Sequence, residues 1–175
     1  MGTRGGIGSA HPPLRAPARF RTLRVVTAAD EIDVAVKLAV YRTFAESGES
    51  PTVKDVSRRA GAGEREVLAS FAHLRSQRLL LLEPDGATIR MAPPFSGIPT
   101  QHRVQSEGVT YFANCAWDAL GIPAALHRTA VVDSRCEQSG EPLFLAVGTR
   151  GPVASDWLFH CLVPAVHWWT DLVFT

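Results

Sequence analysis

The segment from Tyr111 to Pro123 places a thiol and a carboxyl group three residues apart among apolar side chains, at Cys115 and Asp118. On a helix, positions i and i+3 lie on one face, so both side chains would reach one small substrate. A thiolate is a soft nucleophile and a ligand for soft metals, and a carboxylic acid beside it can deliver a proton. This pair is therefore the first candidate for chemistry in the chain.

Taken one at a time, the two residues have plainer interpretations. A single Cys115 is typical of a small buried hydrophobic side chain, and a single Asp118 of a residue that caps a turn or accepts backbone hydrogen bonds. Burial among Tyr111, Trp117 and Leu120 would raise the pKa of the Asp118 carboxyl, which suits a proton donor at neutral pH. The joint pattern favours the chemical interpretation.

Two further cysteines are weaker candidates. Cys136 follows a strand-then-turn pattern, where it packs or supports a site from the turn. His160, Cys161 and His167 offer soft-metal ligands, but Pro164 lies between them and argues against their convergence.

The run from Tyr111 to Leu143, read in one register, resembles the alkylmercury (organomercurial) lyase family. The matching residues are Cys115-Ala-Trp-Asp118, Leu120, Pro123, Arg128-Thr129-Ala130, Cys136 and Ser139-Gly140. The resemblance extends more weakly back to about Asp30. It implies protonolysis of a carbon–mercury bond at a site of two cysteines and one aspartate, with Cys115 as the first cysteine and Asp118 as the aspartate.

The resemblance also places the second catalytic cysteine downstream of a proline-containing strand. The corresponding stretch here is Leu162–Thr175, and the cysteine would be expected just beyond Thr175. Cys136 and Cys161 are retained as lesser mercury ligands. The expected function is an organomercurial lyase with activity lowered by loss of the second thiol. The alternative is a non-catalytic relative that binds a soft metal or acts as a winged-helix regulator.

Composition excludes several classes of protein. Of the 175 residues, 46% are hydrophobic and 20% charged, and the net charge of +1 does not favour nucleic acid or a membrane surface as partner. No apolar run approaches the ~20 residues of a membrane span, and no secretory signal is recognised. Three cysteines indicate free thiols in a reducing cytoplasm rather than a disulfide framework.

No nucleotide-binding or Ser-His-Asp pattern is present, so no cofactor is expected. The expected partners are a small organometallic substrate and a low-molecular-weight thiol.

The chain divides by pattern into four parts. Residues 1–28, rich in Gly, Pro and Arg, predict a flexible leader. Residues 29–92 show helical periodicity followed by a strand, the turn Pro84-Asp85-Gly86 and a returning strand, which predicts a winged helix-turn-helix-like domain. Residues 93–101 form a Pro-rich connection. Residues 102–175 predict an alkylmercury-lyase-like α+β domain, so the fold class is α+β.

Within residues 102–175, a buried helix is expected from Phe112 to Leu126, apolar nearly all round. Strands are expected at residues 129–133, 143–147 and 158–163. The arginines of the helical domain invite a DNA-binding interpretation, but the acidic residues among them and the near-neutral charge favour a scaffold role. Those arginines are Arg58, Arg59, Arg65, Arg75 and Arg78.

Overall fold

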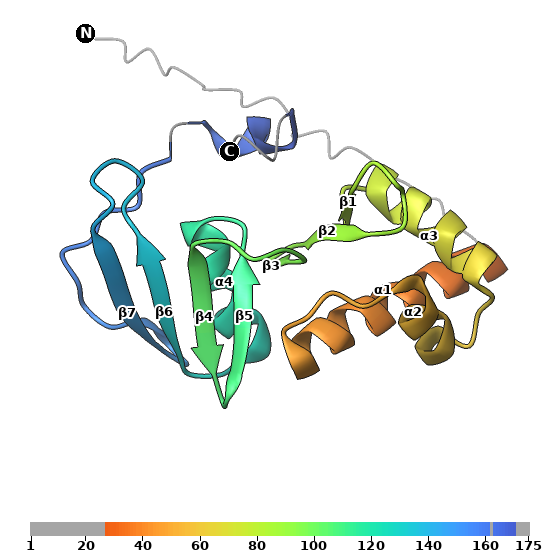
Figure 1. Cartoon of the computed structure of the whole chain (residues 1–175), viewed down its shortest axis with the longest axis horizontal. Coiled ribbons are helices and arrows are strands. Elements are labelled where there is room, and N and C mark those ends of the chain that lie inside the picture. Colours follow the sequence, from red (N-terminus) through yellow and green to blue (C-terminus); the bar gives the residue numbers. More distant parts are fainter. Residues whose placement is uncertain (1–26, 162, 171–175) are drawn as a thin grey trace, which may run out of the picture.

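The described part of the chain begins with three helices, which are followed by a β-hairpin (Figure 1). The structure is a computed structural model that describes residues 27–161 and 163–170. These elements are α1 (Ala28–Ser47), α2 (Val53–Ala60), α3 (Glu64–Ser76), β1 (Leu81–Leu82) and β2 (Ile89–Ala92). The predicted helices and hairpin are confirmed, whereas the winged-helix interpretation stays a prediction. The predicted leader lies outside the described residues as far as residue 26.

A threonine and an aspartate three residues apart start each of the first two helices. Thr27 and Thr52 are the N-caps of α1 and α2, and each side chain accepts a hydrogen bond from the backbone N–H of Asp30 or Asp55. The aspartate side chain in turn accepts from the backbone N–H of the threonine. These reciprocal bonds satisfy N–H groups that have no partner within a helix, and so fix where each helix begins.

Apolar side chains from all three helices form a common core. The fully buried members are Val36, Val40, Phe44, Val56, Val67 and Phe71. In α1 and α3 they recur at four-residue spacing, which places them on the inner face of each helix.

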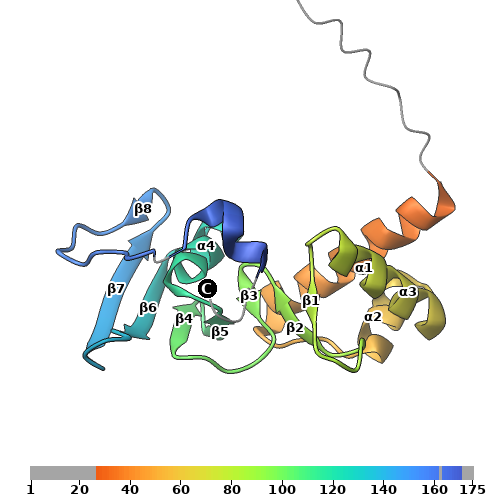
Figure 2. The same cartoon turned by 90° about the horizontal axis from the view of Figure 1, so that it is seen from above.

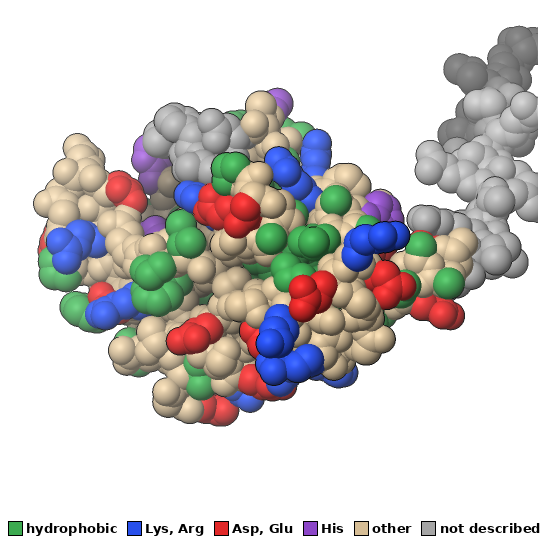
Figure 3. Space-filling model, turned by 45° about the vertical axis from the view of Figure 1, so that its right-hand side comes forward, with side chains coloured by type: hydrophobic (Ala, Val, Ile, Leu, Met, Phe, Trp, Pro, Cys, Tyr) green, Lys and Arg blue, Asp and Glu red, His purple; other side chains and the backbone are tan. Residues whose placement is uncertain are grey.

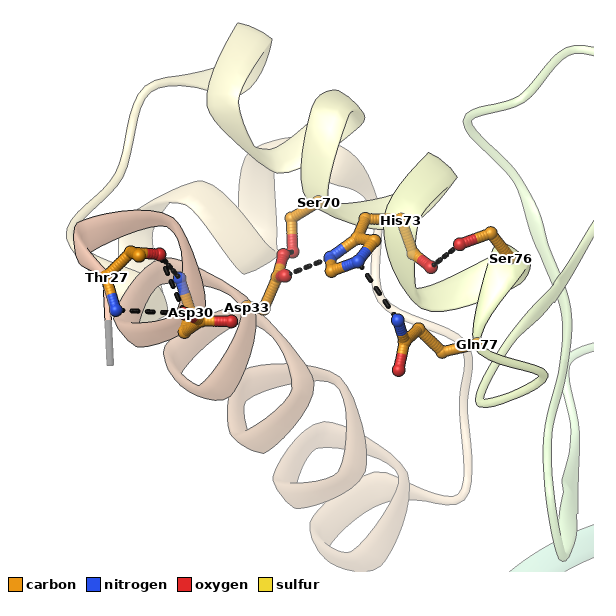
Figure 4. A network of polar contacts seen from close by, with 7 residues as sticks. All are labelled: Thr27, Asp30, Asp33, Ser70, His73, Ser76 and Gln77. Atoms are coloured by element: carbon orange, nitrogen blue, oxygen red, sulfur yellow. Dashed lines mark hydrogen bonds and ion pairs between the residues drawn. The ribbon is translucent and has the colours of Figure 1, made fainter. Parts of the chain in front are cut away.

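A polar cluster joins α1 to α3 at the surface (Figure 4). The Ser70 hydroxyl donates to Asp33 over 2.5 Å, and the His73 ring is hydrogen-bonded to the other oxygen of the same carboxylate. Ser70 therefore bonds to the carboxylate and not to the imidazole. The cluster links two helices and does not form the serine–histidine relay of a hydrolase.

Within the described residues, eight strands form one antiparallel sheet in the order β1-β2-β3-β5-β4-β6-β7-β8. The strands after β2 are β3 (Phe95–Ser96), β4 (His102–Ser106), β5 (Val109–Ala113), β6 (Ala130–Arg135), β7 (Pro142–Gly148) and β8 (Gly151–Pro152). Helix α4 (Ala116–Leu126) packs behind β4 and β5, as Figure 1 shows. Strand β3 lies inside the Pro-rich connection and joins the hairpin to the remaining strands. The mixture of helices and antiparallel sheet confirms the α+β class.

The register of the central strands decides which loops meet. His102 in β4 pairs with Ala113 in β5, and the next residue, Arg103, pairs with Asp133 in β6. Because β5 and β6 are both antiparallel to β4, they run in the same direction and end at the same edge of the sheet. Cys115 and Cys136 each follow closely on one of these strand ends.

Helices α1 to α3, called the helical unit below, are held against the sheet at the C-terminal end of α1. The Tyr111 hydroxyl in β5 donates to the carbonyl oxygen of Ala45 over 2.9 Å. The Phe44 ring stacks on Phe95 with 5.3 Å between centroids, and a Cβ on Gly48 would lie 2.1 Å from the carbonyl oxygen of Thr110. The two parts of the chain therefore pack directly against each other.

Three local predictions for the second half of the chain are wrong. Phe112 belongs to β5, and α4 begins only at Ala116, because the chain stays extended as far as Cys115. The helix is not buried on all sides, since 55% of Trp117 is exposed. No strand is present among the described residues of the stretch 158–163, where Leu158 is 94% exposed. The described residues of that stretch pair with no strand of the sheet, and the last helical turn, η1 (Ala165–Thr170), follows it.

Among residues 27–161 and 163–170, the helices include none with the length and apolar character needed to cross a bilayer.

Candidate active site

Cys115 is the N-cap residue of α4. Its backbone is extended, with φ −151° and ψ 175°, and its Sγ accepts a hydrogen bond from the backbone N–H of Asp118 over 3.5 Å. The N–H of Trp117 is also hydrogen-bonded to this sulfur. An N-cap oxygen usually has this role, because the first N–H groups of a helix have no partner within it. The sulfur is therefore fixed at the positive end of the helix.

Asp118 lies in the first turn of α4 with its carboxyl group half-buried. The Asn114 side-chain amide donates to Asp118 Oδ2 over 3.3 Å, and the Cys115 thiol is hydrogen-bonded to the same carboxyl group. The structure thus brings together the thiol and the carboxyl that the sequence predicts to act together. One is held by backbone N–H groups and the other by a neighbouring amide.

Burial changes the acidity of both groups in the same direction. It raises the pKa of the Asp118 carboxyl, and the hydrogen bonds from Asn114 and Cys115 reduce this effect without reversing it. Burial also raises the pKa of the Cys115 thiol, and the negative charge of Asp118 raises it further. The N–H groups of Asp118 and Trp117 oppose that rise only in part. A proton is therefore retained on this pair more readily than on the same groups in water.

The helical unit and the Pro-rich connection form the back of the site. The Tyr41 hydroxyl on α1 lies 3.1 Å from the carbonyl oxygen of Pro93, to which it donates. Burial, together with the charge of Asp118, raises the pKa of Tyr41 to about 12. A Cβ on Gly121 would lie 3.2 Å from Pro94 Cβ, so α4 approaches this connection closely. Tyr41 and this connection therefore lie on the side of α4 that carries Asp118.

Cys136 lies at the same edge of the sheet as Cys115 but is separated from it by β4. Two strand spacings, roughly 10 Å, separate the ends of β5 and β6. Cys136 begins a tight turn in which its N–H donates to the carbonyl oxygen of Glu141 over 2.9 Å. Hydrogen bonds from the Ser139 hydroxyl and from the N–H groups of Ser139 and Gln138 lower the pKa of this thiol. Cys136 is thus a more readily ionised thiol than Cys115, outside direct contact with it.

Cys161 belongs to the exposed stretch that follows β8. Its thiol donates to the carbonyl oxygen of Val163 over 2.8 Å. The described residues contain no group of three or more His, Cys, Asp or Glu side chains placed to hold a metal ion. The structure therefore does not bring His160, Cys161 and His167 together as a metal site.

An aromatic contact links this exposed stretch to the first turn of α4. The rings of Trp117 and Phe159 lie 5.8 Å apart. Figure 2 shows this stretch leading from β8 to η1, which overlaps α4 in that view. Trp117 therefore packs against Phe159 of this stretch.

A separate polar hollow of about 490 Å³ opens between β4 and β6. It is lined by Thr100, Gln101, Arg103, Asp133, Ser134 and Arg135. The ion pair between Arg103 and Asp133 lies within it. Neither Cys115 nor Asp118 lines this hollow.

Sequence reasoning missed Asn114, Tyr41 and His102. His102 is buried between the ends of β5 and β6, with Nδ1 2.7 Å from the Ser134 hydroxyl, and burial lowers its pKa. Asn114 directly precedes Cys115, and a polar residue at that position was the one available indication. Tyr41 is far from Asp118 in the sequence, and local periodicity carries no information on such a contact.

Comparisons with known proteins relate the second half of the chain to one enzyme family. Residues 95–173 match the MerB alkylmercury lyase family model. The alkylmercury lyases of Bacillus cereus and Clostridium butyricum are each 31% identical over 100 residues, which cover 57% of this chain and 44% of each relative. A crystal structure of the mercury-bound form of MerB2 is similar with a TM-score of 0.55 and 21% identity, over 73% of this chain and 66% of that one.

The matches cover only part of each relative. The aligned part of the chain spans less than half the length of the curated relatives. At 21% identity, the structural match supports the fold alone. The family match includes both Cys115 and Asp118, and the curated relatives are alkylmercury lyases by name. The resemblance predicted from the sequence is thereby confirmed: residues 95–173 are similar to the alkylmercury lyase family.

Proposed function

We propose that this protein cleaves the carbon–mercury bond of an organomercurial by protonolysis. The observation that carries the proposal is the position of the Cys115 thiol and the Asp118 carboxyl at the start of α4, where the Asp118 N–H donates to the sulfur and the thiol interacts with the carboxyl. A soft thiolate suits mercury, and a carboxyl group in contact with it can move the proton that the reaction needs. The match of residues 95–173 to the alkylmercury lyase family model supports an organomercurial as the substrate class.

Each atom in the proposed reaction has a defined destination. Cys115 Sγ binds the mercury of the substrate while its thiol proton passes to the Asp118 carboxylate. The protonated carboxyl then gives that proton to the carbon bound to mercury. The electron pair of the carbon–mercury bond forms the new carbon–hydrogen bond, and the hydrocarbon leaves. Hg(II) stays on Cys115, and Asp118 is again a carboxylate.

The environment of Asp118 supports this role. Burial raises the pKa of the carboxyl, so it accepts the thiol proton more readily than an exposed aspartate would. A second soft ligand is needed on mercury to weaken the bond to carbon. We expect an external low-molecular-weight thiol to supply it, and no resident cofactor. Three free thiols among the described residues support a reducing compartment, as expected for the cytoplasm.

For residues 29–92 we propose a scaffold role rather than DNA binding. Arg58 and Arg59 are ion-paired with Asp55 and Glu46. On the face that Figure 3 presents, basic and acidic side chains are interspersed. A DNA-binding surface usually gathers basic residues along one face. The alternative function is a non-catalytic soft-metal binder or a winged-helix regulator. In a soft-metal binder, Cys115 would hold the metal and Asp118 would transfer no proton.

The test is release of hydrocarbon from an arylmercury compound in the presence of excess thiol, by gas chromatography. We expect release by the 175-residue chain and by a Cys161→Ser control. Cys115→Ser should lose both mercury binding and release. Asp118→Asn should keep mercury binding but lose release. Mercury binding without release by the unaltered chain would overturn the lyase proposal and favour the soft-metal binder.

A further inference from the structure

Asn114 connects the carboxyl group of Asp118 to the backbone of β3. Its side-chain Nδ2 lies 3.3 Å from Asp118 Oδ2 and 3.4 Å from the carbonyl oxygen of Phe95. The residue is half-buried, between the end of β5 and the start of α4. One amide nitrogen thus faces two oxygen acceptors.

The backbone partner fixes which way the amide points. A carbonyl oxygen can only accept a hydrogen bond, so the side facing Phe95 must be the –NH₂ group. That group carries two hydrogens, one for each acceptor. If the amide were turned over, its oxygen would face two other oxygens, and all three would lose a partner. The orientation therefore follows from the contacts themselves.

This arrangement makes the two oxygens of Asp118 different. Because –NH₂ only donates, Oδ2 is held as an acceptor and is not the oxygen that carries a proton. We propose that Asn114 is a positioning residue that holds Oδ2 and leaves Oδ1 as the oxygen that exchanges the proton with Cys115 and the substrate carbon. The inference rests on the proposed lyase function and adds a residue to it.

Phe95 gives the bridge a rigid support. Its ring is 3% exposed and lies between Phe44 of α1 and Tyr111 of β5, at centroid distances of 5.3 and 5.7 Å. Its backbone pairs with Ala113, immediately before Asn114. The helical unit thus fixes Phe95, which holds Asn114, which orients Asp118. Rigid support of this kind is what keeps a proton-transfer group in reacting geometry.

The matched variants are Asn114→Leu and Thr100→Val. Leucine is similar in size to asparagine but cannot donate, so both bridging hydrogen bonds are lost. Thr100 donates to the carbonyl oxygen of Ala113 over 2.6 Å at the same edge of the sheet. Valine at this position removes a side chain–backbone hydrogen bond without touching Asp118. Any effect shared by both variants is structural.

The experiment follows a single turnover of an arylmercury compound with excess thiol in the full chain. Capture is measured as loss of the free Cys115 thiol, and protonolysis as hydrocarbon released. Asn114→Leu should capture mercury at a rate within about twofold of wild type but release hydrocarbon about 10- to 100-fold more slowly. Thr100→Val should change neither rate by more than about twofold. Unchanged release in Asn114→Leu, or equal slowing in Thr100→Val, would overturn the proposal.

A readout without mercury separates this proposal from the lyase function. In crystal structures, the Asp118 side chain should hold one orientation in wild type and Thr100→Val and adopt others in Asn114→Leu. An unchanged Asp118 in Asn114→Leu would refute the positioning role whether or not the protein turns over. Failure of the wild type to release hydrocarbon would instead refute the lyase function alone.

Discussion

The backbone N–H of Asp118 donates a hydrogen bond to the Sγ of Cys115, so the proposed nucleophile also caps the helix that carries its proton-transfer partner. The sulfur and the carboxyl group are separated by a single turn of backbone, and this bond fixes their relative position. Mercury bound to the sulfur would compete with the N–H groups for the same lone pairs. Capture of substrate and capping of α4 are therefore linked.

The capping role predicts different effects of two substitutions at Cys115. Serine is a preferred N-cap residue, so Cys115→Ser should unfold at nearly the same urea concentration as wild type. Cys115→Ala leaves the first N–H groups of α4 without that partner and should lower the free energy of unfolding by about 1 kcal/mol. Neither variant should bind mercury at the site. Equal urea midpoints for the serine and alanine variants would show that the sulfur does not stabilise the helix.

Two glycines at helix ends offer a matched test of how the helical unit docks on the sheet. Gly48 and Gly61 both have positive φ, 76° and 67°, at the C-caps of α1 and α2. A Cβ on Gly61 meets nothing within 4 Å, whereas one on Gly48 would lie 2.1 Å from the carbonyl oxygen of Thr110.

Gly61→Ala should therefore lower the free energy of unfolding by about 1 kcal/mol, from backbone strain alone. Gly48→Ala adds a collision between α1 and β5 and should lower it by at least about 3 kcal/mol. The measurement is urea unfolding followed by circular dichroism. Similar losses for both variants would mean that α1 can move away from β5 at little cost.

The two sheet-edge thiols should differ in the pH at which they react with iodoacetamide. In a Cys136→Ser/Cys161→Ser background, only Cys115 remains, and its raised pKa moves the half-maximal rate to a higher pH than that of an ordinary thiol. In a Cys115→Ser/Cys161→Ser background, hydrogen bonds to Cys136 lower its pKa, and the half-maximal rate falls at a lower pH than that of an ordinary thiol. The thiolate is the reacting form in both, so the order of the two curves follows the order of the two pKa values.

The same assay tests the coupling of Cys115 to Asp118. The negative charge of Asp118 disfavours the thiolate, so Asp118→Asn should lower the pKa of Cys115. Its alkylation curve should move to lower pH, while that of Cys136 stays in place. A curve that stays fixed or moves to higher pH would show that the carboxylate does not act on the thiol.

Elements set by local sequence were predictable in this chain, and elements set by distant partners were not. The residues Thr27, Gly48, Thr52 and Gly61 mark helix ends through their own side chains or backbone, and the helices lie where they indicate. The run at residues 158–163 is apolar enough for a strand, but a strand also requires a neighbour with free backbone groups. That requirement cannot be seen in the run itself.

The site divides in the same way. Cys115 and Asp118 are close in sequence, so helical spacing alone predicts that their side chains lie near each other. The apolar character of Phe112 continues the pattern and predicts that it belongs to their helix, yet the pairing of β5 with β4 keeps the chain extended there. Asn114 acts through the carbonyl group of Phe95, and Tyr41 lies beside Asp118 only because α1 docks on the sheet. Neither contact produces a periodic pattern in the sequence.

The last prediction concerns the second soft ligand on mercury. Cys136 is separated from Cys115 by β4, and the Cys161 thiol is hydrogen-bonded within its own exposed stretch. We therefore expect the 175-residue chain to capture an arylmercury compound through Cys115 but to release hydrocarbon slowly unless thiol is added. A ligand missing from the transition state costs tenfold in rate for each ~1.4 kcal/mol.

Added thiol should restore release only in part, because a free molecule lacks the orientation of a tethered side chain. The measurement is the rate of benzene release from phenylmercury against thiol concentration, for wild type, Cys136→Ser and Cys161→Ser. For all three proteins, the rate of benzene release should be low without thiol and should increase equally as the thiol concentration increases. If Cys136→Ser or Cys161→Ser alone slows release by about tenfold, a difference of ~1.4 kcal/mol in the barrier, that cysteine supplies the second thiolate. The chain would then have to move at the sheet edge during turnover, since neither sulfur is in contact with Cys115 in the structure.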